Sequence, residues 1–238
     1  MTEGRNILIC GRTGSGKSYL VKRLIHWSDR LVVYGPKREE CDYPGVYFDG
    51  MQQRIPMHDN YGSWVEPNGF TQFVHWWQMC ERGVDSFRLL PPPENAEWSR
   101  GDPCRCFRIV YRPADLFDIE EFDKVARLAY ACGNLTFVCE ELMTYTTERN
   151  IGQGFKRLLV AGRTRGVNCF MLTQRPYKIP REVTSQAREA YIFATHEPAD
   201  LDYCRQMFGT EMMTKLESLQ PYEHVHWLDS GEVEVGKA

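Results

Sequence analysis

The residues best suited to chemistry lie near the start of the chain, where residues 11–18 read Gly-Arg-Thr-Gly-Ser-Gly-Lys-Ser. Glycines let a backbone wrap an anion, so that successive N–H groups point at phosphate oxygens. In a loop of this type Lys17 neutralises the β- and γ-phosphates, and the hydroxyl of Ser18 ligates Mg²⁺. The pattern predicts a nucleoside triphosphate site formed by Gly11, Arg12, Thr13, Gly14, Ser15, Gly16, Lys17, Ser18 and Tyr19.

The sequence on both sides of this loop supports the same interpretation. Residues 6–10 form a short apolar run, as in a buried parallel strand. After the loop, apolar residues recur at helical spacing at Leu20, Val21, Leu24 and Ile25. This order of strand, loop and helix places the phosphates at a helix N-terminus, and it disfavours an ordinary glycine-rich turn.

Two adjacent carboxylates follow a second apolar run. Residues 135–139 are typical of a buried strand, and Glu140 and Glu141 stand directly after it. Ligands of parallel sheets bind beyond the carboxyl ends of the strands. One carboxylate there can hold Mg²⁺ through water, while its neighbour orients or deprotonates an attacking water. The pair favours hydrolysis over transfer to a bulky acceptor, although acids at a helix N-terminus are also favoured by the helix dipole alone.

A polar side chain also ends the next predicted strand, residues 167–173, where Gln174 follows. An amide at a strand tip can sense the γ-phosphate or position a water molecule. A glutamine there is equally common as a plain surface residue, so the two interpretations stay open on chemistry alone.

Composition limits the classes of protein. The 238 residues, with 42% hydrophobic and 26% charged residues, suit a single domain over 1–238. No apolar run approaches the roughly 18 residues that a membrane span needs, and the N-terminus leads straight into the first strand without room for a signal peptide. A net charge of −3 argues against a protein that coats nucleic acid, but residues 146–190 hold nine Lys/Arg against three Asp/Glu.

The nine cysteines are scattered and odd in number, which is typical of reduced thiols in an intracellular protein. Cys104 and Cys106, with Cys80 and His75 upstream, resemble metal ligands in type. Their spacing lacks a second matching pair, so a zinc site is the weaker interpretation.

The periodicity of the remaining chain predicts an α/β fold with a mainly parallel central sheet, helices on both faces and a C-terminal β-hairpin. Strands are expected at residues 31–34, 107–111, 135–139, 167–173 and 190–195. Helices are expected at 119–132, where Gly133 and Asn134 end the pattern, and at 154–162, 182–188, 199–208 and 211–219. The hairpin is expected over 222–235, with its turn at 229–231.

The segment 44–106 breaks this regular alternation and is predicted to be an irregular insertion within the domain. It is rich in Trp and Pro, with a short amphipathic helix expected near 73–80 and an extended Pro run at 91–93. No chemistry follows from its pattern.

Two stretches carry a resemblance to a known family. Residues 162–167, Gly-Arg-Thr-Arg-Gly-Val, and residues 172–176, Leu-Thr-Gln-Arg-Pro, resemble the Gly-Arg-x-x-Gly turn and Thr-Gln-Arg-Pro strand end of the FtsK/HerA superfamily of DNA-pumping ATPases. The short chain is most similar to the genome-packaging ATPases of icosahedral, internal-membrane-containing viruses. The resemblance covers residues 5–27 and 107 to about 227, and it implies a RecA-like P-loop fold.

The resemblance also implies roles for single residues. Residues 11–18 bind ATP with Mg²⁺, Glu141 activates water, Glu140 takes the Mg²⁺-associated position and Gln174 is the polar sensor. Arg163 reaches a γ-phosphate across a subunit boundary, with Arg165 and Arg112 as alternatives. The family usually has Asp before the catalytic Glu; a register shifted by one, with Cys139 and Glu140, fits less well because Cys is a poor Mg²⁺ ligand.

The implied function is ATP-driven translocation of double-stranded DNA that packages a viral genome into a preformed capsid. The family acts as rings, usually hexamers, so further implied partners are copies of the chain itself and capsid vertex proteins, in the host cytoplasm or the virion. Candidate DNA contacts are Arg149, Lys156, Arg157 and Lys178, through sequence-independent phosphate binding. Alternatives are a cellular HerA/FtsK-like translocase, a small-molecule or nucleoside kinase, and a non-catalytic module that docks through the Trp-rich segment.

Overall fold

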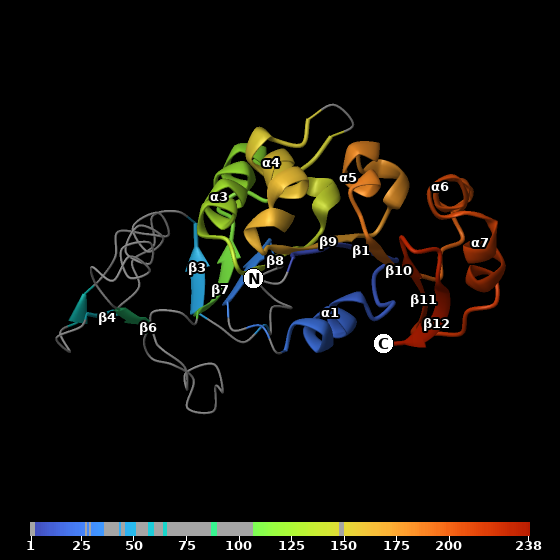
Figure 1. Cartoon of the computed structure of the whole chain (residues 1–238), viewed down its shortest axis with the longest axis horizontal. Coiled ribbons are helices and arrows are strands. Elements are labelled where there is room, and N and C mark those ends of the chain that lie inside the picture. The colour runs from blue at the N-terminus through green and yellow to red at the C-terminus, as the bar shows by residue number, and fades with distance from the viewer. Residues whose placement is uncertain are drawn as a thin grey trace.

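The computed structural model describes residues 3–26, 28, 30–35, 43, 46–50, 57–59, 64–65, 87–89, 107–147 and 150–238 (Figure 1). The helix expected near 73–80, the Pro run at 91–93, and the candidate zinc ligands Cys80, His75, Cys104 and Cys106 lie outside these residues.

A nine-stranded sheet organises the described chain, in the order β12-β11-β10-β1-β9-β8-β2-β7-β3. The strands from β10 to β3 are parallel, whereas β11 and β12 form an antiparallel hairpin at one edge. The expected mainly parallel α/β architecture with a C-terminal hairpin is therefore confirmed. Strand bounds are β1 Asn6–Cys10, β2 Arg30–Tyr34, β3 Val46–Asp49, β7 Phe107–Arg112, β8 Thr136–Cys139, β9 Asn168–Thr173, β10 Glu189–Phe193, β11 Glu223–Leu228 and β12 Val233–Lys237.

Strand β3 was not predicted. It lies within the segment 44–106, which was predicted to be irregular. It pairs in parallel with β7 and extends the central sheet. Four residues are too few for period-two alternation to stand out from noise. The same segment also contributes a small antiparallel sheet in the order β5-β4-β6, with β4 at Met57–Asp59, β5 at Trp64–Val65 and β6 at Phe87–Leu89.

Helices cover both faces of the sheet (Figure 1). Helix α1 lies on one face, and α3, α4 and α5 lie on the other, while α6 and α7 stand beside the C-terminal hairpin. Their bounds are α1 Lys17–Ile25, α3 Ile119–Cys132, α4 Gln153–Ala161, α5 Arg181–Ser185, α6 Pro198–Phe208 and α7 Thr210–Leu216. The last residues expected in the helices at 182–188 and 211–219 are not helical; the rest agree within one or two residues.

Alternation along the strands divides the core into two clusters. In β1, Leu8 and Cys10 face the side covered by α3 and α4, whereas Ile7 and Ile9 pack with residues of α1. All four side chains are buried. A strand that is apolar on both sides is what a parallel sheet between two helix layers requires.

Side-chain hydrogen bonds at their N-termini hold helices α3 and α4 in place. Asp118 caps α3 by accepting from the amides of Glu120 and Glu121 at 2.8 and 3.0 Å. The buried carboxylate of Asp123 in α3 accepts from the amides of Gly154 and Phe155 at 2.6 and 3.0 Å, so it caps α4 in turn. Such caps satisfy donors that the first helical turn leaves without partners.

Among the described helices, none combines the length and the apolar character needed to cross a lipid bilayer.

Phe122 lies in the core cluster beneath α3 and α4 and is fully buried. Its ring centroid lies 4.8 to 5.1 Å from those of Phe155, Tyr34 and Tyr145, so we expect this part of the core to depend on it. Phe122→Ala should lower the free energy of unfolding by about 3–5 kcal/mol, because the cavity cannot collapse between paired rings. Urea denaturation measures the loss. The control is Phe117→Ala, at a side chain 72% exposed, which should leave stability nearly unchanged.

Candidate active site

The phosphate loop joins the carboxyl end of β1 to the first turn of α1. Gly16 has φ 104°, in the left-handed region that side-chain-bearing residues rarely adopt. At Gly11, an added Cβ would lie 2.6 Å from Cβ of Phe193, so no side chain fits there. The glycines predicted to shape the loop are thus required by backbone conformation and by close approach to β10.

Lys17 is held inside the loop. Its Nζ donates to the carbonyl of Gly11 at 2.5 Å and to that of Arg12 at 3.0 Å, and the residue is buried. These two bonds fold the side chain back across the loop, where it presents a positive charge to the space that the loop encloses. This is the position from which a phosphate can be neutralised.

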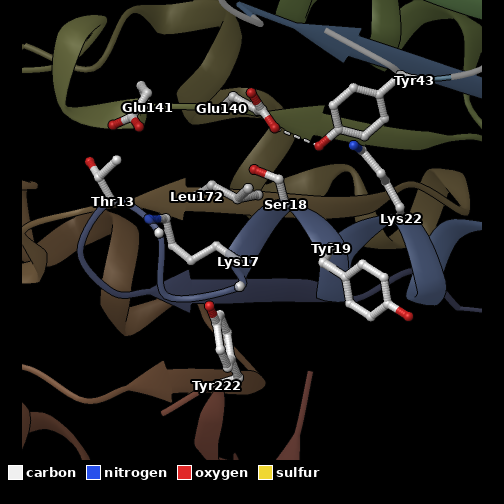
Figure 2. A pocket seen from close by; sticks show the side chains of 12 residues that line it. Thr13, Lys17, Ser18, Tyr19, Lys22, Tyr43, Glu140, Glu141, Leu172 and Tyr222 are labelled. Atoms are coloured by element: carbon white, nitrogen blue, oxygen red, sulfur yellow. Dashed lines mark hydrogen bonds between the residues drawn. The ribbon is translucent and has the colours of Figure 1, made fainter. Parts of the chain in front are cut away.

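A cavity of about 300 Å³ opens between the loop and the end of β8 (Figure 2). This loop cavity has a size at the lower end of ordinary small-molecule sites. Its lining joins the predicted loop residues to both predicted carboxylates: Thr13, Gly14, Gly16, Lys17, Ser18, Tyr19, Lys22, Tyr43, Glu140, Glu141, Leu172 and Tyr222.

Glu140 is positioned by three groups. Its amide donates to the carbonyl of Tyr34 at 3.0 Å, and its Oε1 accepts from the hydroxyl of Tyr43 at 2.5 Å (Figure 2). The hydroxyl of Ser18 lies beside the same carboxylate (Figure 2). Burial raises the pKa of Glu140 above its usual range, and the bond from Tyr43 and the Ser18 hydroxyl act against that rise.

Glu141 contacts Gln174 across the ends of two neighbouring strands. Nε2 of Gln174 donates to Oε1 of Glu141 at 2.8 Å. Glu141 itself has φ 52° and ψ 47°, a left-handed conformation unusual for a residue other than glycine. Its carbonyl accepts from both the amide and the hydroxyl of Thr144 at 2.8 Å, which holds this strained turn in place.

The oxygen atoms of Ser18 and Glu140 fit Mg²⁺. Magnesium prefers oxygen ligands, keeps several waters, and is commonly held by one or two carboxylates together with substrate phosphates. A hydroxyl and a carboxylate that line the same cavity at the phosphate loop supply such a pair. Within the described residues no group of three or more His, Cys, Asp or Glu forms an all-protein metal cage.

Cys139 would lie beside the metal if the motif were aligned one residue earlier, but its side chain does not reach the cavity. Its side chain is fully buried in the core cluster beneath α3 and α4, and burial raises the pKa of its thiol well above the usual range. It does not line the loop cavity, whereas Glu140 and Glu141 both do.

The candidate arginines occupy different edges of the sheet. Arg163 starts the short turn η3, Arg163–Arg165, before β9; its carbonyl accepts from the amide of Gly4, and its Nε pairs with Glu3 at 2.9 Å. Six residues, 5–10, separate Gly4 from the loop, which is about 20 Å of extended chain. Arg163 and Arg165 therefore lie at the amino edge, away from their own loop, whereas Arg112 ends β7 at the carboxyl edge.

The candidate DNA contacts are spread over several elements. Lys156 and Arg157 are neighbours on α4, where Lys156 pairs with Glu182 at 2.7 Å and Arg157 lies over the ring of Tyr130. Lys178 ends the turn η4, Pro176–Lys178, after β9. Arg149 lies outside the described residues.

Four residues that line the cavity were not predicted: Lys22, Tyr43, Leu172 and Tyr222. Lys22 follows Ser18 by one helical turn and Leu172 lies in the predicted strand 167–173, so a local pattern could have found both. Tyr43 is buried and donates to Glu140, but no motif marks it in the sequence. Tyr222 lines the cavity from the opposite end of the chain and has φ 66°. Only the three-dimensional path of the chain brings Tyr43 and Tyr222 to the loop.

Comparison with solved structures places this geometry among known folds. The genome packaging NTPase B204 from Sulfolobus turreted icosahedral virus 2, in complex with ATP-gammaS, matches with a TM-score of 0.66 and 17% identity over 100% of this chain and 98% of that chain. The chain shares its fold with a genome-packaging NTPase. No protein-family model and no curated protein matches the sequence.

Two further neighbours extend the likeness. The bacterial conjugative coupling protein TrwBdeltaN70 matches with a TM-score of 0.56 and 12% identity over 99% of this chain and 85% of that chain. The cytoplasmic domain of the Thermomonospora curvata Type VII secretion ATPase EccC gives 0.51 and 14% over 99% of this chain and 25% of that chain. At these identities the comparisons establish the fold, and the RecA-like P-loop architecture implied by the resemblance is confirmed.

We expect Glu140→Gln to stabilise the protein at neutral pH. Because the folded-state pKa of Glu140 is raised, the ionised carboxylate costs stability above the folded pKa, and that cost disappears below the unfolded pKa near 4.5. The uncharged amide removes the cost while it can still accept from Tyr43. Urea midpoints of both proteins, measured from pH 8 down to pH 4, should show a gain that shrinks as the pH falls; a gain that grows toward acid would contradict the assignment.

Proposed function

We propose that this protein is an ATP-hydrolysing translocase of double-stranded DNA that packages a viral genome into a preformed capsid. The observation that carries the hydrolytic part is the Glu141–Gln174 contact beside the phosphate loop. The fold shared with packaging and coupling ATPases supports the motor part. Those neighbours include proteins described as DNA-packaging and conjugative coupling proteins.

Each group at the site has a role in hydrolysis. The loop amides and Lys17 bind the phosphates, and the carboxylate of Glu141 accepts a proton from the attacking water. Gln174 orients that carboxylate through its hydrogen bond, and its amide can also sense whether the γ-phosphate is present. When bound at Ser18 and Glu140, Mg²⁺ neutralises charge on the β- and γ-phosphates.

A ring of subunits completes the site in this proposal. Arg163 lies about 20 Å from its own loop along the strand direction, so it can reach a γ-phosphate only from a neighbouring subunit. An arginine supplied in trans stabilises charge on the transferred phosphoryl group and ties hydrolysis to subunit contact. The family usually forms hexamers, and we propose that ring size here; Arg165 is the second choice for this role, and Arg112 the third.

The proposed partners follow from the same function. Double-stranded DNA would contact basic side chains such as Lys156, Arg157, Lys178 and Arg149, through phosphates and therefore without sequence preference. Capsid vertex proteins would hold the ring, and the protein would act in the host cytoplasm or in the virion. The likeness to TrwBdeltaN70 favours, as the second candidate, a cellular HerA/FtsK-like DNA translocase.

ATPase activity with and without long double-stranded DNA tests the motor. Stimulation by DNAs of unrelated sequence is expected, because the proposed contacts are to phosphates. The control is the same assay with nucleosides and other small phosphate acceptors. ATP consumption that depends on such an acceptor, with a phosphorylated product, would identify a kinase and overturn the proposal.

We expect Glu141→Gln to lower kcat for ATP hydrolysis by about 100-fold or more while ATP binding is retained, because only the proton acceptor is lost. Steady-state hydrolysis and nucleotide titration measure the two effects separately. Glu140→Gln is the matched variant and should instead raise the Mg²⁺ concentration needed for activity. Normal turnover in Glu141→Gln, with none in Glu140→Gln, would mean that the roles are exchanged.

Mixing two inactive variants tests the arginine in trans. Arg163→Ala keeps its own Glu141, and Glu141→Gln keeps its own Arg163, so a ring that contains both has complete sites at some boundaries. We expect the mixture to hydrolyse ATP faster than either protein alone. Activity equal to the mean of the two would rule out Arg163 as the shared group, and the same pairing with Arg165→Ala is the matched control.

A further inference from the structure

A second cavity adjoins the phosphate loop on its other flank. This flank cavity has a volume of about 540 Å³ and lies against Arg12 and Ser15 of the loop, Phe193 at the end of β10, and the turn before β11. It shares Thr13, Gly14 and Tyr222 with the loop cavity. The two cavities therefore meet at the phosphate loop and Tyr222, so Tyr222 stands where a ligand of the loop cavity would enter the flank cavity.

The loop sets the direction in which a bound nucleotide must extend. Its lysine reaches the β- and γ-phosphates, so the terminal phosphate belongs beside Lys17 and the two carboxylates. Figure 2 shows Glu140 and Glu141 on one side of the loop and Tyr222 on the other. The nucleoside end then leaves the loop on the side of Tyr222.

Tyr222 presents a fixed aromatic surface at that point. Its side chain is 58% exposed, and its Cδ1 lies 3.6 Å from where a Cβ on Gly16 would be. The backbone around it is held by hydrogen bonds from the amide of Ala238 to the carbonyl of Tyr222, at 2.9 Å, and from the amide of Glu223 to the carbonyl of Gln220, at 3.0 Å. The backbone of Tyr222 has a left-handed φ of 66°, and its ring faces the loop (Figure 2).

We propose that Tyr222 and the flank cavity form the subsite for the nucleobase, with the base stacked on the tyrosine ring. This inference rests on the proposed binding of ATP and adds which residue receives the base. Stacking of a base on an aromatic ring is strong and depends little on base identity, because every base has a π-face. The rest of the nucleotide is bound by groups that the loop already supplies.

The experiment compares two probes, ATP and inorganic tripolyphosphate, in calorimetric titrations with Mg²⁺. Tyr222→Ala should weaken ATP binding about tenfold, because the stacking contact is lost. Binding of tripolyphosphate should not change, since it has no base. Tyr222→Phe should bind ATP as the unmodified protein does. Tyr222→Asn tests the same loss with a side chain that tolerates the left-handed backbone.

Tyr177→Ala is the matched control, because Tyr177 is also exposed, at 52%, but lines neither cavity. Unchanged ATP binding in Tyr222→Ala and Tyr222→Asn would overturn the subsite, as would an equal loss of ATP and tripolyphosphate affinity. The test is separate from that of the motor: tight ATP binding with no response to DNA would contradict translocation and leave the nucleobase subsite standing.

Discussion

Parallel pairing of β8, β9 and β1 is the constraint on which the site depends. In this register Cys10 stands beside Thr173, and Cys139 stands beside Met171. The residues that follow each strand, the phosphate loop, Glu140 and Gln174, therefore emerge at one edge of the sheet. A shift of one residue would turn the strand faces over and carry these side chains away from one another.

The site is assembled at a cost to stability. Burial opposes the charge of Glu140 and raises its pKa, and Glu141 occupies a left-handed conformation. Strain of this kind persists only where the surrounding structure determines the conformation. Here the two core clusters hold the strands rigidly from both faces, and the bond from Gln174 connects the strained turn to the neighbouring strand.

The sequence predicted those parts of the site that have a local pattern. The loop, the carboxylates after β8 and Gln174 after β9 each follow an apolar strand, so parallel topology alone brings them together. Tyr43 and Tyr222 have no such pattern, because they reach the loop only through the folded path of the chain. The left-handed turn at Glu141 was also unpredictable, since glutamate rarely adopts it. Strand β3 was not predicted because a run of four residues is too short to show a clear strand periodicity.

The most direct test of translocation uses a DNA duplex that carries a third strand bound at one end as a triplex. A protein that moves along the duplex displaces that strand, so release of the strand measures translocation. With ATP, the protein should displace it from duplexes of unrelated sequence, whereas Glu141→Gln with ATP, or the unmodified protein without ATP, should not. ATP hydrolysis that DNA stimulates without any displacement of the third strand would contradict the account of this protein as a motor.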